Sequence, residues 1–105
     1  MEKSIFLDYV GDSPRMKDLQ LFIEGREMDY TLTDLLNAGV SWGTLNFLIP
    51  ELVALEIIKK TRKIGRATLY KINENNEFAR ELIQLYDKMI LLELNNKNKK
   101  IAVRV

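Results

Sequence analysis

The sequence of 105 residues contains no cysteine and no histidine, and it has only 5 glycines and 2 prolines. Without cysteine there is no disulfide framework, thiol nucleophile or thiolate metal site. Without histidine, the commonest general base and the commonest metal ligand are both missing. These absences exclude zinc fingers and Ser-His or Cys-His catalysis, and no Gly-rich phosphate loop or paired-carboxylate motif takes their place. We therefore expect neither an enzyme nor a metal or other cofactor.

Long hydrophobic runs are missing as well. No apolar run reaches the roughly 18 residues of a membrane span, and the N-terminus carries acidic residues early, unlike a signal peptide. With 47% hydrophobic and 30% charged residues, the composition is typical of one globular domain with a single core. We expect a cytoplasmic protein with no membrane partner.

Charge is unevenly distributed along the chain, although the net charge is only +1. Residues 1–56 hold 4 basic and 10 acidic residues, whereas residues 57–105 hold 12 basic and 5 acidic residues. The segment 57–73 has six basic residues and no acidic one: Lys59, Lys60, Arg62, Lys63, Arg66 and Lys71. A basic stretch this concentrated favours phosphate binding. The alternative is a solvated edge strand, on which lysines block aggregation.

The first third of the chain is predicted to be mostly helical. Residues 5–10 fit either a short strand or a helical turn. Ser13 is a good N-cap, and apolar residues at helical spacing after it predict a helix over about 14–24. A brief second helix follows, capped by Thr31 or Thr33.

A tight turn precedes the third predicted helix. Gly39 supplies a positive φ in this turn, and Ser41 caps a helix that runs from about 42 to 55. Pro50 lies inside this helical pattern. It removes one backbone hydrogen bond, and we expect it to bend or split the helix.

The remaining elements are a hairpin and a long helix. Residues 57–64 and 67–72 read as two strands, joined by Gly65-Arg66 in a type II′ turn. The last helix is predicted over about 77–94. The basic tail, 95–105, is expected to be either disordered or a terminal strand.

This order of elements is that of a winged helix-turn-helix, an α+β fold that is mostly α, with a long C-terminal helix. We expect one domain over residues 1–94. In such a fold the third helix enters the major groove, and its N-terminal residues reach the base edges. The basic hairpin 57–72 lies on the phosphate backbone or reaches the minor groove.

Three stretches carry a resemblance to a known family: Asp12–Arg15, Ala38–Leu45 and Lys60–Tyr70. They resemble archaeal winged helix-turn-helix transcriptional regulators of the ArsR/MarR-like kind. The resemblance covers about residues 5–94, and its most specific part is the hairpin. It implies a DNA-binding homodimer, with the long C-terminal helix at or near the dimer contact.

Two residues depart from the pattern expected of that family. Phe47 stands where such recognition helices often carry a polar or basic residue. Glu56 stands where a glycine often ends the helix before the wing.

The candidate DNA-binding residues come from the start of the third helix and from the hairpin. They are Ser41, Trp42, Gly43, Thr44, Asn46, Phe47, Lys60, Arg62, Lys63 and Arg66. Asn46 either pairs with adenine or is simply solvated, and Phe47 touches a thymine methyl group or another protein. Trp42 either packs on its own domain or lies against sugar-phosphate or a thymine methyl group.

The last predicted helix has two apolar stripes about 120° apart. One consists of Phe78, Leu82, Leu85, Met89 and Leu92. The other consists of Ala79, Ile83, Tyr86, Ile90 and Leu94. A helix on a single core needs only one such stripe. We expect the first to pack on the domain and the second to form a dimer interface through Ile83, Tyr86, Ile90 and Leu94. The alternative is that the N-terminal segment covers the second stripe.

The leading hypothesis is therefore a dimeric, sequence-specific transcription regulator whose partners are double-stranded DNA and a second copy of itself. The alternative is a winged-helix protein-protein interaction module, which the apolar residues of the third helix favour.

Overall fold

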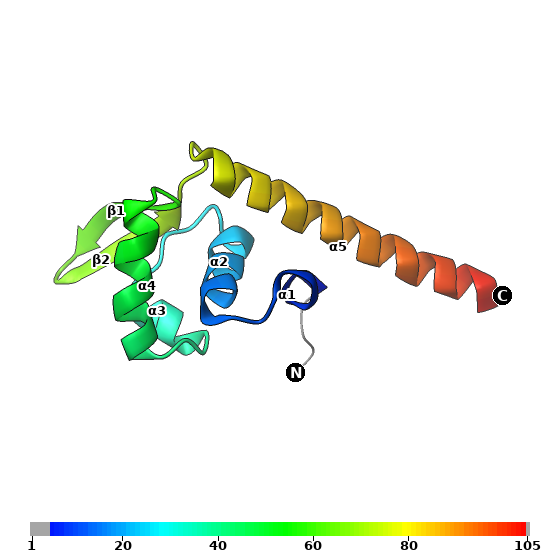
Figure 1. The fold of residues 1–105 in the computed structure, drawn as a ribbon, viewed down its shortest axis with the longest axis horizontal. Helices are drawn as coiled ribbons and strands as arrows, with labels where there is room; N and C mark the ends of the chain where they lie inside the picture. The colour runs from blue at the N-terminus through cyan, green and yellow to red at the C-terminus, as the bar shows by residue number, and fades with distance from the viewer. Residues whose placement is uncertain (1–4, 105) are drawn as a thin grey trace.

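A computed structural model describes the backbone of residues 5–104 and the side chains of residues 5–96. The fold is α+β and mostly helical, with a two-stranded hairpin and a long C-terminal helix, which confirms the predicted fold class. Figure 1 shows the elements in chain order. They are α1 (Ile5–Val10), α2 (Pro14–Glu24), α3 (Leu32–Asn37), α4 (Trp42–Ala54), β1 (Ile58–Ile64), β2 (Ala67–Ile72) and α5 (Glu77–Arg104).

Side-chain caps set the helix starts, because each satisfies a backbone N–H that has no partner within its helix. The hydroxyl of Ser13 caps α2, and that of Ser41 caps α4. Thr31 and Asp34 form a reciprocal capping box at the start of α3, so Thr31 is the cap rather than Thr33. The segment 5–10, left open between strand and helix by the sequence, is the helix α1.

The hairpin turns where the sequence predicts. Ile64 pairs with Ala67, which leaves a two-residue loop. Gly65 has a φ of 61°, and Arg66 does not have a positive φ, a pattern that fits the type II′ turn. A β-bulge lies between Lys60 and Arg62, so the intervening Thr61 has no Cα partner in the register of β1 with β2.

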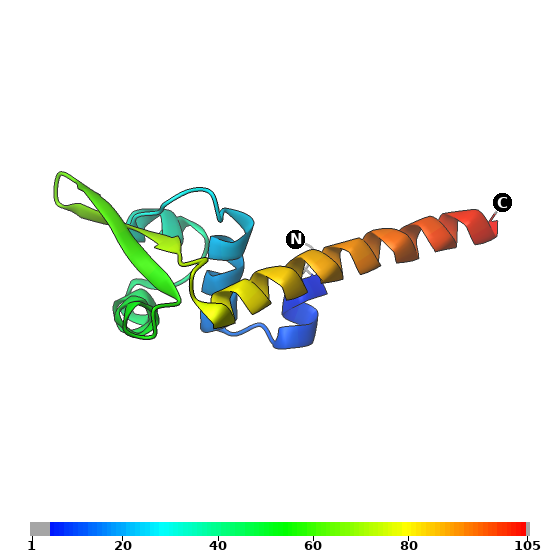
Figure 2. The same cartoon turned by 90° about the horizontal axis from the view of Figure 1, so that it is seen from above.

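The core lies where the first four helices, the base of the hairpin and the first half of α5 meet. Its largest fully buried side chains include Phe6, Phe22, Leu35, Leu45 and Leu52. Helices α1 and α2 both contact α5. The hairpin projects at one end of the molecule, and α5 runs out at the other (Figure 1 and Figure 2).

Pro50 does not split the third predicted helix, because α4 is continuous from Trp42 to Ala54. Pro50 is exposed, and so is Asn46 four residues earlier on the same side of the helix. The carbonyl of Asn46, which loses its helical partner, therefore lies on the wet side, where water can bind it.

Helix α5 is longer than predicted. It continues past residue 94 to Arg104, so the segment 95–104 is neither a strand nor disordered but helical. No glycine or proline occurs between Glu77 and Arg104, and the helix therefore meets no breaker. Residue 105 and the side chains of residues 97–105 lie outside the described part of the chain.

Candidate nucleic-acid interface

The start of α4 is built by a local hydrogen-bond network. Ser41 accepts a hydrogen bond from the backbone N–H of Thr44 at 3.3 Å, and its hydroxyl also donates to the hydroxyl of Thr44 at 2.8 Å. Thr44 is half-buried. Ser41 and Thr44 therefore hold the first turn of the helix together, and their hydroxyls are bonded to each other.

The outer face of α4 is exposed. Leu45, Leu48, Ile49 and Leu52 point into the core, as the periodicity predicts. On the other side, Trp42 is 52% exposed and Phe47 is 73% exposed, while Gly43 and Asn46 are exposed as well. Four predicted contact residues thus share one open face.

This face carries no charge. The one charged residue of α4 is Glu51, whose carboxylate is hydrogen-bonded and ion-paired to Arg15 of α2. Helix α4 therefore presents an amide and two aromatic rings, and any electrostatic attraction to phosphate must come from elsewhere.

The hairpin supplies that charge. Lys60, Lys63 and Arg66 are exposed, and none of them forms an ion pair with another residue in the described part of the chain. Paired residues of an antiparallel hairpin point to the same side, and Lys60 pairs with Tyr70 while Lys63 pairs with Thr68. Lys60 and Lys63 therefore share one face of the wing, and Arg66 lies at its tip.

Arg62 differs from the other basic residues of the hairpin because its side chain is ion-paired. Its guanidinium forms two hydrogen bonds with Asp29, from the loop that precedes α3, and Thr61 donates a third to the same carboxylate. These hydrogen bonds, with Arg62 first and Thr61 second, hold the pKa of Asp29 down to about 2. Arg62 is thus committed within the domain.

Helix α4 and the hairpin lie side by side at the same end of the molecule, as both views show (Figure 1 and Figure 2). Helix α4 contacts β1 directly. The uncharged face and the basic hairpin are therefore neighbouring parts of one end of the protein, away from the C-terminal half of α5.

The structure corrects the expected use of the two stripes on α5. In the first stripe, Leu82 and Met89 are buried in the core as predicted, whereas the other three residues are exposed. Ile83 is buried, and Tyr86 packs half-buried with its ring 5.4 Å from that of Phe6, centroid to centroid. Ile90 is half-buried. The prediction that these three residues are left free for a partner is wrong, because α1 docks on this side of α5. The N-terminal segment covers the stripe at Tyr86, as the alternative expects, and leaves Leu94 exposed.

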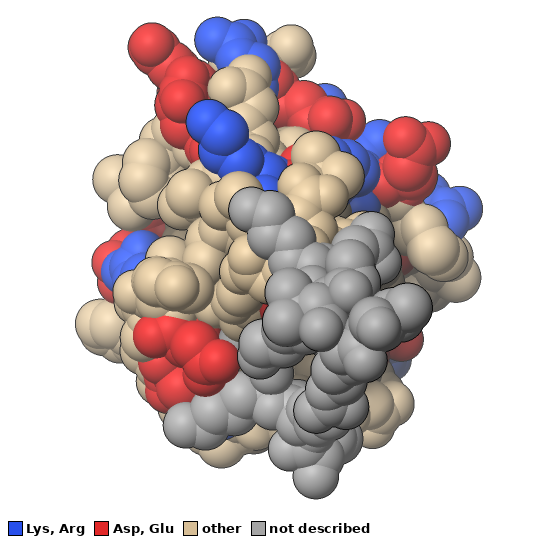
Figure 3. All heavy atoms as spheres, turned by 90° about the vertical axis from the view of Figure 1, so that its right-hand side faces the viewer, with Lys and Arg blue, Asp and Glu red and all other residues tan. Residues whose placement is uncertain are grey.

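The free apolar residues of α5 are others. Phe78, Leu85 and Leu92 are exposed and recur every seven residues, so they lie in one line along the helix. Leu94, from the predicted interface, is 52% exposed. Viewed from the end at which α5 projects, uncharged surface lies beside the helix, with acidic and basic side chains around it (Figure 3).

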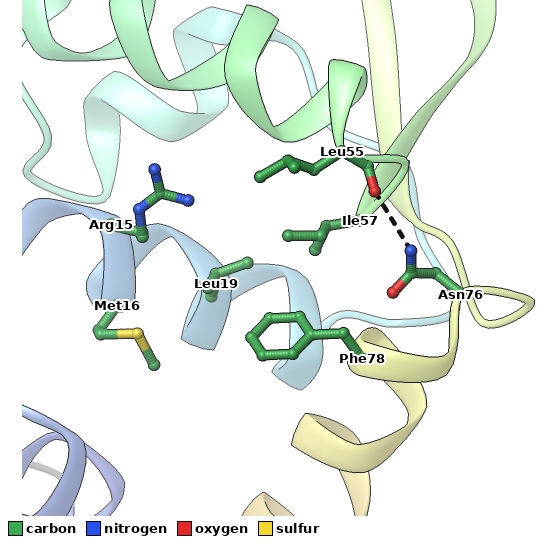
Figure 4. Close-up of a pocket in the computed structure, with 7 residues that line it drawn as sticks. All are labelled: Arg15, Met16, Leu19, Leu55, Ile57, Asn76 and Phe78. Atoms are coloured by element: carbon green, nitrogen blue, oxygen red, sulfur yellow. Dashed lines mark hydrogen bonds between the residues drawn. The ribbon is translucent and has the colours of Figure 1, made fainter.

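An apolar pocket of about 340 Å³ lies at the base of this line. It is lined by Arg15, Met16, Leu19, Leu55, Ile57, Asn76 and Phe78. Figure 4 shows Phe78 of α5 facing Leu19 of α2, with Asn76 bonded to the carbonyl oxygen of Leu55. The pocket therefore joins the end of α4 to the start of α5.

Sequence reasoning missed one buried charge. Asp18 of α2 is fully buried, and neither of its carboxylate oxygens has a hydrogen-bond partner among the described residues. This burial raises its pKa to about 6. Its position four residues before the core residue Phe22 was the available signal.

Two kinds of feature are missing from the described residues. No described helix is both long and apolar enough to cross a membrane. No group of three or more acidic side chains in the described part of the chain could hold a metal ion.

Comparison with known proteins gives a distant structural match. No protein-family model matches the chain, and no curated protein matches it. Among solved structures, the crystal structure of M. tuberculosis Rv0081 is similar, with a TM-score of 0.56 and 21% sequence identity over 88% of each chain. At this identity the likeness concerns the fold alone.

Proposed function

We propose that this protein is a dimeric, DNA-binding transcription regulator of the winged helix-turn-helix class, as its resemblance to ArsR/MarR-like regulators implies. One observation carries the proposal. Basic side chains of the hairpin that are exposed, and that form no ion pair with the described residues, lie next to the exposed face of α4. Cations beside a free helix are what a duplex requires, because phosphates give affinity and a helix in the major groove gives specificity.

In this proposal Lys60, Lys63 and Arg66 neutralise phosphates, and the start of α4 lies in the major groove. Arg62 has a supporting role, because Asp29 already occupies its guanidinium. Ser41 and Thr44 stabilise the start of α4 and are bonded to each other, so we assign base contacts to Asn46, Trp42 and Phe47 instead.

The proposed dimer uses the line of Phe78, Leu85 and Leu92 rather than the residues that α1 covers. Exposure of these apolar side chains to water costs about 25 cal/mol per Å² of apolar surface. Packing them against the same residues of a second copy removes that cost. Two copies related by a twofold axis would place two α4 helices on half-sites about one turn of DNA apart.

The proposal is tested by fluorescence anisotropy on random duplexes at two or more salt concentrations. Lys63→Ala with Arg66→Ala should flatten the log-log salt dependence by about 0.9 for each phosphate that the variant no longer neutralises. The matched control is Arg80→Ala with Lys88→Ala, which removes the same charge from exposed positions on α5. Equal losses of affinity in both variants would show that charge acts nonspecifically, and no duplex binding by the wild type would refute the proposal.

A protein-protein interaction module is the second candidate, and one observation favours it. The outer face of α4 combines Trp42, Phe47 and Pro50 and has no charge. Exposed aromatic residues without charge are typical of protein contacts. If the wild type fails to bind any duplex, this candidate becomes the better explanation of the face.

A further inference from the structure

The exposed face of α4 places one amide between two aromatic rings. At 100° per residue, the exposed residues span an arc of about 140°, with Trp42 at one edge and Phe47 at the other. Asn46 lies between them, beside Gly43 and Pro50, and all of these residues are exposed. Any surface that docks here therefore meets the Asn46 amide between two aromatic rings, nearer to Trp42 than to Phe47.

The groups that read G·C pairs are missing from this helix. Guanine is read in the major groove by arginine or lysine, and cytosine by a carboxylate. Helix α4 contains no arginine or lysine, and its one carboxylate, Glu51, is bonded to Arg15. The hydroxyl of Thr44 accepts a hydrogen bond from Ser41, and a threonine hydroxyl does not distinguish between the base pairs. Asn46 remains for adenine, and apolar side chains remain for the thymine methyl group.

We propose that α4 recognises A·T base pairs, with the Asn46 amide on adenine and the rings of Phe47 and Trp42 against the methyl groups of neighbouring thymines. This inference rests on the proposed function and defines the DNA that the same site selects. The wing supplies affinity for any duplex, and α4 supplies the choice of sequence.

Gly43 supports this reading. A Cβ added at Gly43 would meet nothing within 4 Å, and its φ is not positive, so neither packing nor the backbone requires a glycine there. Glycine inside a helix lowers stability. Glycine at this position therefore favours binding rather than folding. Without a side chain at Gly43, the base edges can come close to the backbone of α4 between Asn46 and Phe47.

The experiment begins with selection of bound duplexes from a random pool, using the full chain. The selected half-site should be rich in A·T pairs. Each thymine of that site is then replaced by uracil, which removes only the methyl group. Affinity should fall about fourfold for each methyl group that the protein buries.

Variants assign the methyl contact to residues. Phe47→Ala should bind the thymine and uracil versions of at least one position equally well. Asn46→Ala should lose roughly 5- to 150-fold in affinity for the selected site and little for random duplex. Gly43→Ala should fold more stably and yet bind the selected site more weakly. The control is Tyr9→Ala on α1, an aromatic residue that is 77% exposed and lies away from α4. Circular dichroism confirms that each variant is folded.

The outcomes separate the two proposals. A G·C-rich selected site, or no effect of uracil at any position, would overturn the A·T inference and leave a DNA-binding protein. An unchanged preference for thymine in both Phe47→Ala and Trp42→Ala would also overturn it. No binding to any duplex would instead refute the proposed function.

Discussion

Asp29 and Arg62 tie the wing to the body of the domain. The Nε of Arg62 donates to Oδ2 of Asp29 at 2.9 Å, and Nη2 donates to Oδ1 at 3.2 Å. Thr61, the bulged residue of the hairpin, donates to the same carboxylate at 2.6 Å. The bulge therefore aims two side chains of β1 at a loop 32 residues earlier in the chain.

Arg62 should matter less for DNA affinity than its neighbour Lys63. Arg62→Ala should leave the salt dependence of duplex binding nearly unchanged, because its guanidinium is neutralised by Asp29. Lys63→Ala should lower the slope by about 0.9. Asp29→Asn should raise affinity and steepen the slope, since it frees Arg62. Anisotropy titrations over a salt series measure all three, and an equal loss from Arg62→Ala and Lys63→Ala would contradict this assignment.

Asp18 should make the protein less stable as the pH rises through the mildly acidic range. Its folded-state pKa is about 6, against 3.8 for an ordinary aspartate, so the folded state binds the proton more tightly than the unfolded chain. This contribution to stability is full below about pH 3.8 and is lost as the pH rises to about 6. The difference corresponds to about 3 kcal/mol, and Asp18→Asn should recover part of it at pH 7.5.

Urea denaturation of both proteins at several pH values measures this effect. The Asp18→Asn variant should lose the fall in stability between pH 4 and pH 6 that the wild type shows. Asp8→Asn, a change at an exposed aspartate of α1, serves as the control and should leave the pH profile as it is. A wild type whose stability rises across this range would show that other groups dominate.

Glutamate substitutions on the two sides of α5 should have different effects, one on dimerisation and the other on folding. Leu85→Glu with Leu92→Glu should yield a folded monomer, because both residues are exposed on the line proposed to pair. Ile83→Glu should instead unfold the domain, since it buries a carboxylate in the core. Light scattering reports the mass, and circular dichroism reports the fold. A dimer that survives the double substitution would place the contact elsewhere.

Glu56 should be replaceable by glycine with a gain in stability. Its φ is 61°, in the left-handed region that favours glycine. The left-handed backbone costs a residue with a Cβ about 1–2 kcal/mol of folding free energy. Glycine avoids this cost but loses more chain entropy on folding, so only part of it is recovered. Glu56→Gly should therefore raise the free energy of unfolding by about 0.5–1 kcal/mol. Glu56→Ala keeps the Cβ and should show no such gain.

Features made by near neighbours in the chain were predictable from the sequence. Ser13 and Ser41 cap helices through bonds to residues three positions later, and Gly65 turns the hairpin by its own φ. The order of elements, and with it the winged-helix class, followed from these local signals. The exposed face of α4 also followed, because the helical period alone sets Trp42, Asn46 and Phe47 opposite the leucines.

Features that depend on distant partners were decided only by the tertiary structure. Periodicity could show that α5 has more apolar surface than one core needs, but only the docking of α1, with Phe6 against Tyr86, determines which side is covered. In the sequence, Arg62 does not differ from the basic residues around it, and only the fold places Asp29 beside it. Likewise, only the fold buries Asp18. Charge and periodicity are properties of the sequence, whereas burial and pairing depend on which segments meet in space. The sequence therefore determined the elements and the basic wing, and tertiary packing determined which residues remain free to bind.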